Sequence, residues 1–235
     1  CINIPFFLSR FVWVASSNYS QHCSKAVLKA IKSLWQESSS NKQVITSDRI
    51  HNLISQTNHS SKRYGAAATL AMILGLVNDD NSIKIRITHV GDSRVYHLPK
   101  DSIQWQCLTR DHNLLNELVD QQAHEQGRNA EFTDYNHKGM ASSLYNITEC
   151  FALDTDGAHP SSEAPNSSVQ TVIVNSGDCL LVCTDGIHDL VSSKHWQLIN
   201  AKTDLQEWLK TLKDQVYDSE GNAYDNGTAI LVRFS

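Results

Sequence analysis

Apolar side chains recur every three or four residues in several stretches of the chain, and this spacing is typical of a helix that packs one face on a core. The first stretch begins at Ser20, which can cap a helix, and a shorter one begins at Ser47. The polar run 36–42 between them is predicted to be a loop. Residues 113–126 and the segment that starts at Thr203 carry the same spacing and are also predicted helices.

Apolar and polar side chains alternate along residues 82–90, which is the period of a half-buried strand. The run 65–77 before it fits either a helix or a buried strand by periodicity alone. Residues 78–81 are Asn-Asp-Asp-Asn, a strong turn composition, and therefore favour a hairpin of two strands. Further short apolar segments are predicted strands: 94–98, 103–108, 169–174, 179–183 and 228–234.

The turns at 91–93 and 175–178 each join two of these strands, and we expect each turn to connect antiparallel neighbours within one sheet. Strands in hairpins, with the helices kept in separate blocks, indicate antiparallel sheets covered by helices. The predicted fold class is α+β.

The chain has 235 residues, which is within the range of one domain, so a single domain over 1–235 is expected. The formal net charge is −5 and no run of Lys or Arg occurs, which disfavours nucleic acid and anionic membranes as partners. The longest apolar stretches fall short of the roughly 20 residues that a membrane span needs, so a cytoplasmic protein is expected. The six cysteines show no repeated C-x-x-C spacing, which predicts neither a disulfide scaffold nor a zinc site.

Aspartates lie in turns at the ends of several predicted strands: Asp92, Asp111, Asp185 and Asp225. Turns at one edge of a sheet bring side chains to one rim, where carboxylates repel one another unless a hard divalent cation such as Mg²⁺ or Mn²⁺ neutralises them. Each aspartate taken alone is better explained as a turn or helix-cap residue. Their combination in order is what indicates a site.

Five ordered segments carry a resemblance to a known family: 65–74, 87–94, 108–114, 180–189 and 225–232. In order and spacing they resemble successive motifs of the bacterial type 2C (PPM-type) metal-dependent protein serine/threonine phosphatases. Ordered motifs are far more specific than a single one. The resemblance implies a sandwich of two antiparallel β-sheets flanked by helices, with a binuclear metal centre at one edge.

Matched motif by motif, the resemblance implies metal ligands at Asp185, Asp225, Asp111 and Asp189. The first two correspond to carboxylates that hold one of the paired metals, and the last two to ligands of an additional, weaker ion. Asp92 corresponds to a structural residue of its motif. The implied cofactors are two or three Mg²⁺ or Mn²⁺ ions, and no catalytic residue beyond the metal ligands is implied.

The sequence departs from the family pattern near its start. The family's first motif places an Asp-Gly pair after a strand that corresponds to residues 11–15, but this chain has Ser16-Ser17. The pair is either replaced, carried by a loop missing from this sequence, or lost with an upstream strand. The flanking residues favour an omission, so the chain is expected to lack part of its N-terminal segment. His112 and His188 adjoin motif aspartates but are given no metal role, because adjacency is not ligation.

The resemblance implies hydrolysis of phosphomonoesters by a metal-activated water. The implied substrates are phosphoserine and phosphothreonine proteins, and a serine/threonine kinase is the implied opposing enzyme. The alternative, which Ser16-Ser17 supports, is an inactive pseudophosphatase that acts as a phosphoprotein-binding or regulatory module. A regulatory domain of a larger chain is a third hypothesis.

Overall fold

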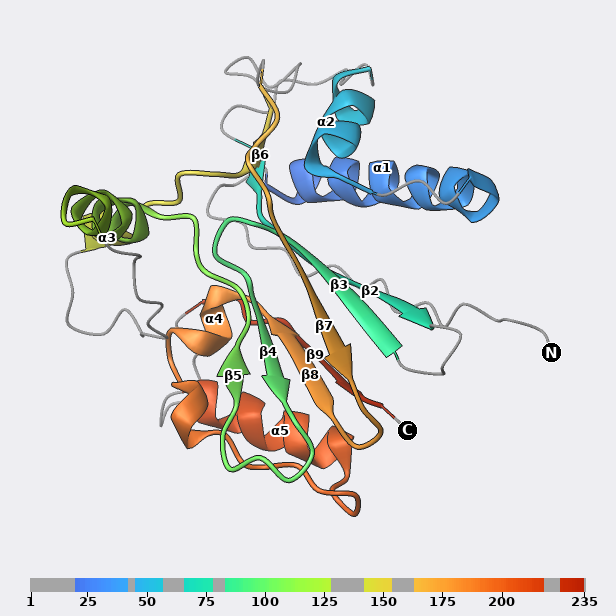
Figure 1. The fold of residues 1–235 in the computed structure, drawn as a ribbon, viewed down its shortest axis with the longest axis vertical. Coiled ribbons are helices and arrows are strands. Elements are labelled where there is room, and N and C mark those ends of the chain that lie inside the picture. The colour runs from blue at the N-terminus through green and yellow to red at the C-terminus, as the bar shows by residue number, and fades with distance from the viewer. Residues whose placement is uncertain are drawn as a thin grey trace.

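The computed structural model describes residues 20–41, 45–56, 66–77, 83–127, 142–153, 163–217 and 225–234 (Figure 1). The α-helices in these ranges are α1 Ser20–Asn41, α2 Ser47–Ser55, α3 Leu114–Glu125, α4 Asp185–His188 and α5 Leu205–Val216. Short 3-10 helices are η1 Ser142–Tyr145 and η2 Ser193–His195. No helix in the described ranges is both long enough and apolar enough to cross a membrane.

The strands form three sheets. They are β1 Ala67–Ala68, β2 Leu70–Val77, β3 Ile83–Val90, β4 Arg94–Leu98, β5 Gln106–Cys107, β6 Phe151–Ala152, β7 Ser168–Val174, β8 Cys179–Cys183 and β9 Ala229–Arg233. One sheet has the order β2-β3-β7, the second has the order β5-β4-β8-β9, and β1 pairs with β6. All of these pairings are antiparallel, which confirms the predicted α+β class.

The two larger sheets pack face to face. Ile85 and Ile87 of β3 share one apolar cluster with Val95 of β4 and with Leu180 and Val182 of β8. Helices α1 and α2 pack against β1, β2 and β6, and α5 packs against the outer face of the four-stranded sheet (Figure 1). The layers are therefore helices, sheet, sheet and helix, which is the expected sandwich flanked by helices.

The turns at 91–93 and 175–178 do not form the expected hairpins. β3 pairs with β2 and β7, whereas β4 pairs with β5 and β8, so each turn carries the chain from one sheet to the other. At Gly91 φ is +96°, and a Cβ there would lie 2.3 Å from Cγ2 of Thr69. The chain can cross this sharply because glycine has no Cβ. Alternation along the sequence cannot reveal the crossing, because strands of both sheets bury an apolar face.

Some predicted boundaries were also wrong. α1 runs to Asn41, so most of the loop expected at 36–42 is helical, since polar residues such as Gln and Glu are good helix formers. The strand expected at 103–108 is reduced to β5, because Ile103 is 87% exposed and packs on no core. The run 65–77 was assigned correctly, since β1 and β2 lie within it.

His89, near the end of β3, is fully buried beside His112, with the two ring centroids 4.9 Å apart. Burial, followed by the charge of His112, lowers the pKa of His89 from its ordinary 6.5 to about 3. The unfolded chain therefore takes up this proton at a higher pH than the folded chain does. The stability linked to neutral His89 is complete above pH 6.5 and is lost as the pH falls toward 3.

We expect the protonation of His89 to lower the free energy of unfolding by about 2 kcal/mol as the pH falls from 6.5 to 5. The reason is that one proton bound only by the unfolded chain changes this free energy by about 1.36 kcal/mol per pH unit. His89→Leu removes the titrating ring and should flatten that part of the profile, as measured by urea unfolding at a series of pH values. His195→Leu, at an exposed position, is the control and should keep the wild-type slope. An unchanged slope in His89→Leu would show that another group is responsible.

Candidate metal centre

A pocket of about 470 Å³ opens where the turns that follow β3 and β8 meet. It is lined by the carboxylates of Asp92, Asp185 and Asp189. The other lining residues come from β1 and its end and from the segment between α3 and β6: Ala67, Ala68, Thr69, Tyr145, Asn146, Ile147 and Cys150. No Lys or Arg is among these described lining residues, so none of them balances the three carboxylates.

Tight packing at two glycines, Gly91 and Gly186, fixes the positions of Asp92 and Asp185. Asp92 follows Gly91, whose positive φ turns the chain at the end of β3. Asp185 is the first residue of α4, and only Thr184 separates it from the end of β8. The next residue, Gly186, packs so tightly that a Cβ there would lie 2.6 Å from the carbonyl oxygen of Asn226. The pocket therefore forms at an edge of the sandwich where both sheets end, with one glycine beside Asp92 and another beside Asp185.

The carboxylates in the pocket destabilise one another's charge. Burial, and then the nearby charges of Asp185, Asp111 and Asp189, raise the pKa of Asp92 well above its usual value, against an opposing effect of Arg94. Burial also raises the pKa of Asp185 to about 6. Among the described residues, Oδ1 of Asp92 is buried with no hydrogen-bond partner. A buried carboxylate oxygen of this kind needs a proton or a cation.

The donor set suits a hard divalent ion. All three carboxylates offer oxygen, the ligand atom that Mg²⁺ and Mn²⁺ prefer. The side chains do not close around one point, since no group of three or more His, Cys, Asp or Glu in the described ranges is arranged to hold an ion. Mg²⁺ commonly keeps several waters when protein carboxylates bind it. The pocket therefore fits an ion that is partly hydrated or that gains ligands from the rest of the chain.

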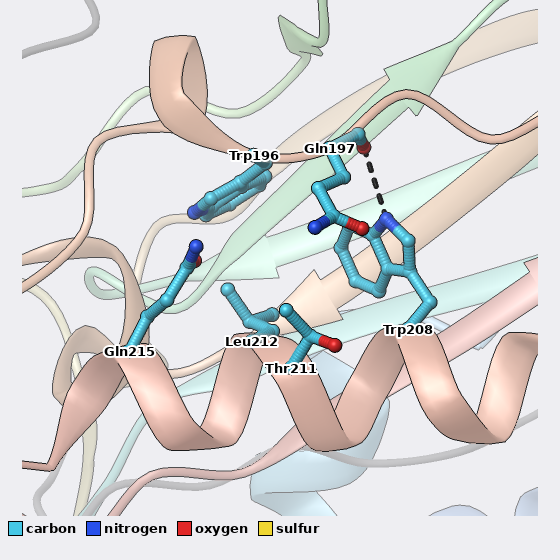
Figure 2. A pocket seen from close by; sticks show the side chains of 6 residues that line it. All are labelled: Trp196, Gln197, Trp208, Thr211, Leu212 and Gln215. Carbon is cyan, nitrogen blue, oxygen red and sulfur yellow. Dashed lines mark hydrogen bonds between the residues drawn. The ribbon is translucent and has the colours of Figure 1, made fainter.

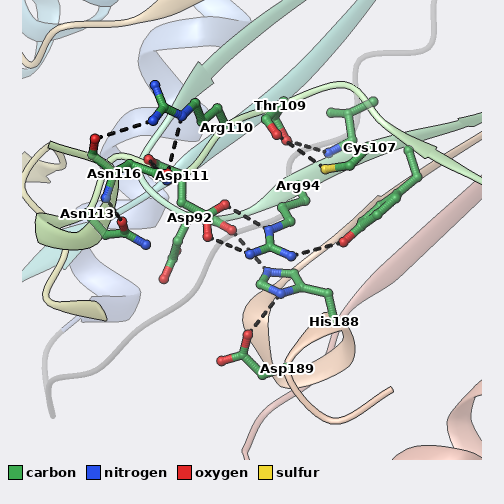
Figure 3. Close-up of polar contacts among 12 residues, drawn as sticks. Asp92, Arg94, Cys107, Thr109, Arg110, Asp111, Asn113, Asn116, His188 and Asp189 are labelled. Atoms are coloured by element: carbon green, nitrogen blue, oxygen red, sulfur yellow. Dashed lines mark hydrogen bonds and ion pairs between the residues drawn. The ribbon is translucent and has the colours of Figure 1, made fainter. Parts of the chain in front are cut away.

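Asp111 lies apart from the pocket wall, in a buried ion pair (Figure 3). Nε of Arg94 donates to Oδ1 of Asp111 at 2.8 Å, and a terminal nitrogen of Arg94 donates to Oδ2 at 2.7 Å. Although burial alone would raise it, this guanidinium lowers the pKa of Asp111 below its usual range. Both oxygens of Asp111 are therefore already bound, whereas Asp92, matched from sequence to a structural role, faces the pocket.

Asp225 is exposed near Asp185, and its charge contributes to the raised pKa of Asp185 after burial. It is not among the residues that line the pocket, and its Oδ1 accepts a hydrogen bond from the backbone N–H of Asn226 at 2.6 Å. Of the four aspartates matched to metal ligands, the structure thus brings Asp185 and Asp189 into the pocket and Asp225 near it. Residues 11–17, where the family pattern fails, lie outside the described residues.

One feature of the sequence bears on which aspartate faces the pocket. Arg94 opens a strand whose other residues are apolar or aromatic apart from His97, and a buried guanidinium requires a carboxylate partner. One of the motif aspartates therefore had to pair with it. The choice between Asp92 and Asp111 depends on side-chain direction, which the sequence does not contain.

A second pocket lies between α5 and the segment after η2 (Figure 2). It is lined by Trp196, Gln197, Trp208, Thr211, Leu212 and Gln215. Nε1 of Trp208 donates to the carbonyl oxygen of Gln197 at 2.9 Å. Because its described lining contains no Asp, Glu, His, Cys or Lys, this pocket offers no side chain for acid–base catalysis.

No family model matches this sequence, and no curated protein matches it. Solved structures do. The serine/threonine phosphatase of S. agalactiae is 20% identical, with a TM-score of 0.64 over 96% of this chain and 86% of that one. The PPM Ser-Thr phosphatase MsPP of Mycobacterium smegmatis, in complex with cacodylate, is 17% identical, with a TM-score of 0.67 over 99% and 90% of the two chains.

The catalytic domain of the phosphatase PstP, solved in complex with two manganese ions, is 19% identical, with a TM-score of 0.59 over 95% of this chain and 85% of that chain. These similarities establish the fold. The chain has the fold of PPM-type serine/threonine phosphatases.

Breaking the buried pair from one side should be costly. Arg94→Met leaves the Asp111 carboxylate buried without its cation, and we expect a loss of about 3–5 kcal/mol in the free energy of unfolding. Asp111→Asn should also destabilise, and the double variant should lose less than the sum of the two, as measured by urea unfolding in EDTA. If Asp111→Asn instead kept full stability and lost Mn²⁺ binding, Asp111 would be a metal ligand.

Neutralising Asp92 should have the opposite effect. Asp92→Asn removes a buried charge that faces other carboxylates, so the metal-free protein should gain about 1 kcal/mol of stability. Added Mn²⁺ should then raise the melting temperature of the variant less than that of the wild type. Asp214→Asn, on the exposed side of α5, should change neither value. A destabilised Asp92→Asn protein in EDTA would contradict the predicted repulsion.

Proposed function

We propose that this chain is a PPM-type, metal-dependent protein serine/threonine phosphatase that hydrolyses phosphomonoesters of phosphoserine and phosphothreonine. The observation that carries the proposal is the buried, unpaired Oδ1 of Asp92 in a pocket shared with Asp185 and Asp189. A phosphate group carries negative charge and would be repelled from this wall. The pocket becomes suited to a phosphate only when cations outweigh its carboxylates.

The proposed cofactors are two or three Mg²⁺ or Mn²⁺ ions. Asp92, Asp185 and Asp189 are the proposed ligands within the pocket, and Asp225 is the proposed ligand at its rim. When bound, such ions activate a water molecule for attack on phosphorus and neutralise the phosphoryl oxygens. Asp111 is left out of this set, because Arg94 binds both of its oxygens.

The described residues argue against a covalent route through cysteine. Cys150 is the one thiol among the residues that line the pocket. Burial, followed by the charges of Glu149 and Asp92, raises the pKa of Cys150, so its thiol stays protonated at neutral pH. A protonated thiol is a poor nucleophile, so Cys150 is not the proposed attacking group.

The proposed substrates are phosphoproteins, and a serine/threonine kinase is the proposed opposing enzyme. A pseudophosphatase would keep the same fold and the same pocket. The two alternatives differ in turnover, which makes a direct assay decisive.

We expect the purified protein to release phosphate from a phosphothreonine peptide with Mn²⁺ and not with EDTA. Asp185→Asn should lower the rate by about 10²-fold or more, since loss of a metal ligand costs several kcal/mol and about 1.36 kcal/mol is tenfold in rate. Asp214→Asn is the matched control on an exposed helix face and should turn over like the wild type. Mn²⁺ binding by calorimetry without phosphate release would favour the pseudophosphatase.

A further inference from the structure

His188 is the last residue of α4 and lies three positions after Asp185. Its side chain is 0% exposed, and it is not among the residues that line the pocket. The ring therefore lies behind the wall that carries Asp185 and Asp189. In Figure 3 it sits below the Arg94–Asp111 pair, between the Asp92 turn and Asp189.

The ring contacts both sides of the pocket. Its Nε2 lies 3.1 Å from the backbone carbonyl oxygen of Asp92, and its Nδ1 lies 3.0 Å from Oδ1 of Asp189. A carbonyl oxygen accepts, so Nε2 donates to Asp92, whereas Nδ1 lies in close contact with the carboxylate of Asp189 without the geometry of a hydrogen bond. His188 thus joins the turn after β3, at the end of one sheet, to α4, which follows a strand of the other sheet.

The imidazole of His188 also affects the pKa of neighbouring carboxyl groups. Burial raises the pKa of Asp185, and the charge of His188 works against that rise. Arg94 is the main group that lowers the pKa of Asp111 against the effect of burial, and His188 adds to it. A single buried imidazole therefore acts on the carboxylates of Asp111 and Asp185 and contacts that of Asp189.

We propose that His188 is a positioning residue that holds the Asp189 carboxylate and the Asp92 turn in the orientation that receives the cation. This inference rests on the proposed function, in that it takes the pocket as a metal centre. Groups that hydrogen-bond to metal ligands from behind fix their orientation, and their loss typically weakens metal binding by about 10–100-fold. Neither carboxylate oxygen nor backbone carbonyl can be held this way by an apolar side chain.

Three substitutions separate the two contacts. His188→Asn places an amide nitrogen near the position of Nδ1 and keeps a donor for Asp189. His188→Gln places one near the position of Nε2 and keeps a donor for the Asp92 carbonyl. His188→Phe keeps a ring of similar size and loses both donors. His195→Phe, at an exposed position of η2, is the control.

The measured quantities are the Mn²⁺ dissociation constant by calorimetry and the urea stability in EDTA, together with phosphate release at increasing Mn²⁺. We expect His188→Phe to bind Mn²⁺ about 10–100-fold more weakly, and the Asn and Gln variants to fall between it and the wild type. Saturating Mn²⁺ should restore most of the turnover number of His188→Phe. The control should match the wild type throughout.

Wild-type Mn²⁺ affinity in His188→Phe, even with reduced stability, would overturn the inference and make His188 an ordinary core residue. If that variant fails to fold, unchanged affinity in both the Asn and Gln variants overturns it equally. Weaker Mn²⁺ binding in the variants, in a protein that releases no phosphate, would support the positioning role and reject the proposed function. Phosphate release by the wild type, together with unchanged Mn²⁺ affinity in all variants, would support the proposed function and reject the positioning role of His188.

Discussion

Repulsion between buried carboxylates is the constraint on which this end of the molecule depends. Asp92 and Asp185 follow strands of two different sheets, and packing the sheets face to face brings them to one pocket. Burial raises the pKa of each, and neighbouring carboxylates raise both further. The sandwich could have avoided this cost with apolar turns, since apolar replacements of buried charges are often stabilising. A pocket lined by three carboxylates, with a buried oxygen of Asp92 that has no hydrogen-bond partner, is therefore the observation that motivates the proposed cation.

One carboxylate of the region is compensated by the protein itself. Arg94 binds both oxygens of Asp111, and the pair is almost fully buried. The guanidinium of Arg94 neutralises Asp111, which lies behind the pocket. The carboxylates that face the pocket have no Lys or Arg beside them among the described lining residues. The protein thus supplies a permanent cation for the scaffold and leaves the accessible charges for an exchangeable one. His188 donates a hydrogen bond from Nε2 to the backbone carbonyl oxygen of Asp92, and its Nδ1 contacts the carboxylate of Asp189.

Much of the fold could be predicted from local patterns. The alternation along 82–90 and the apolar segment 94–98 gave β3 and β4 nearly to the residue, because period-2 burial is a property of each strand alone. The crossing at Gly91 could not be predicted, since it depends on which strands pair far apart in the sequence. For the same reason the motif order could not show that Asp92 lines the pocket whereas Asp111 pairs with Arg94. This difference follows from the direction in which Arg94 points.

The most direct test of a cation held by these carboxylates is diffraction from crystals grown with Mn²⁺, recorded at the manganese absorption edge. We predict anomalous peaks in the pocket within coordination distance of Asp92 and Asp185, with Asp111 still paired to Arg94. Crystals that contain Mn²⁺ elsewhere but none in this pocket, or a peak on Asp111 with Arg94 turned away, would contradict the proposed site.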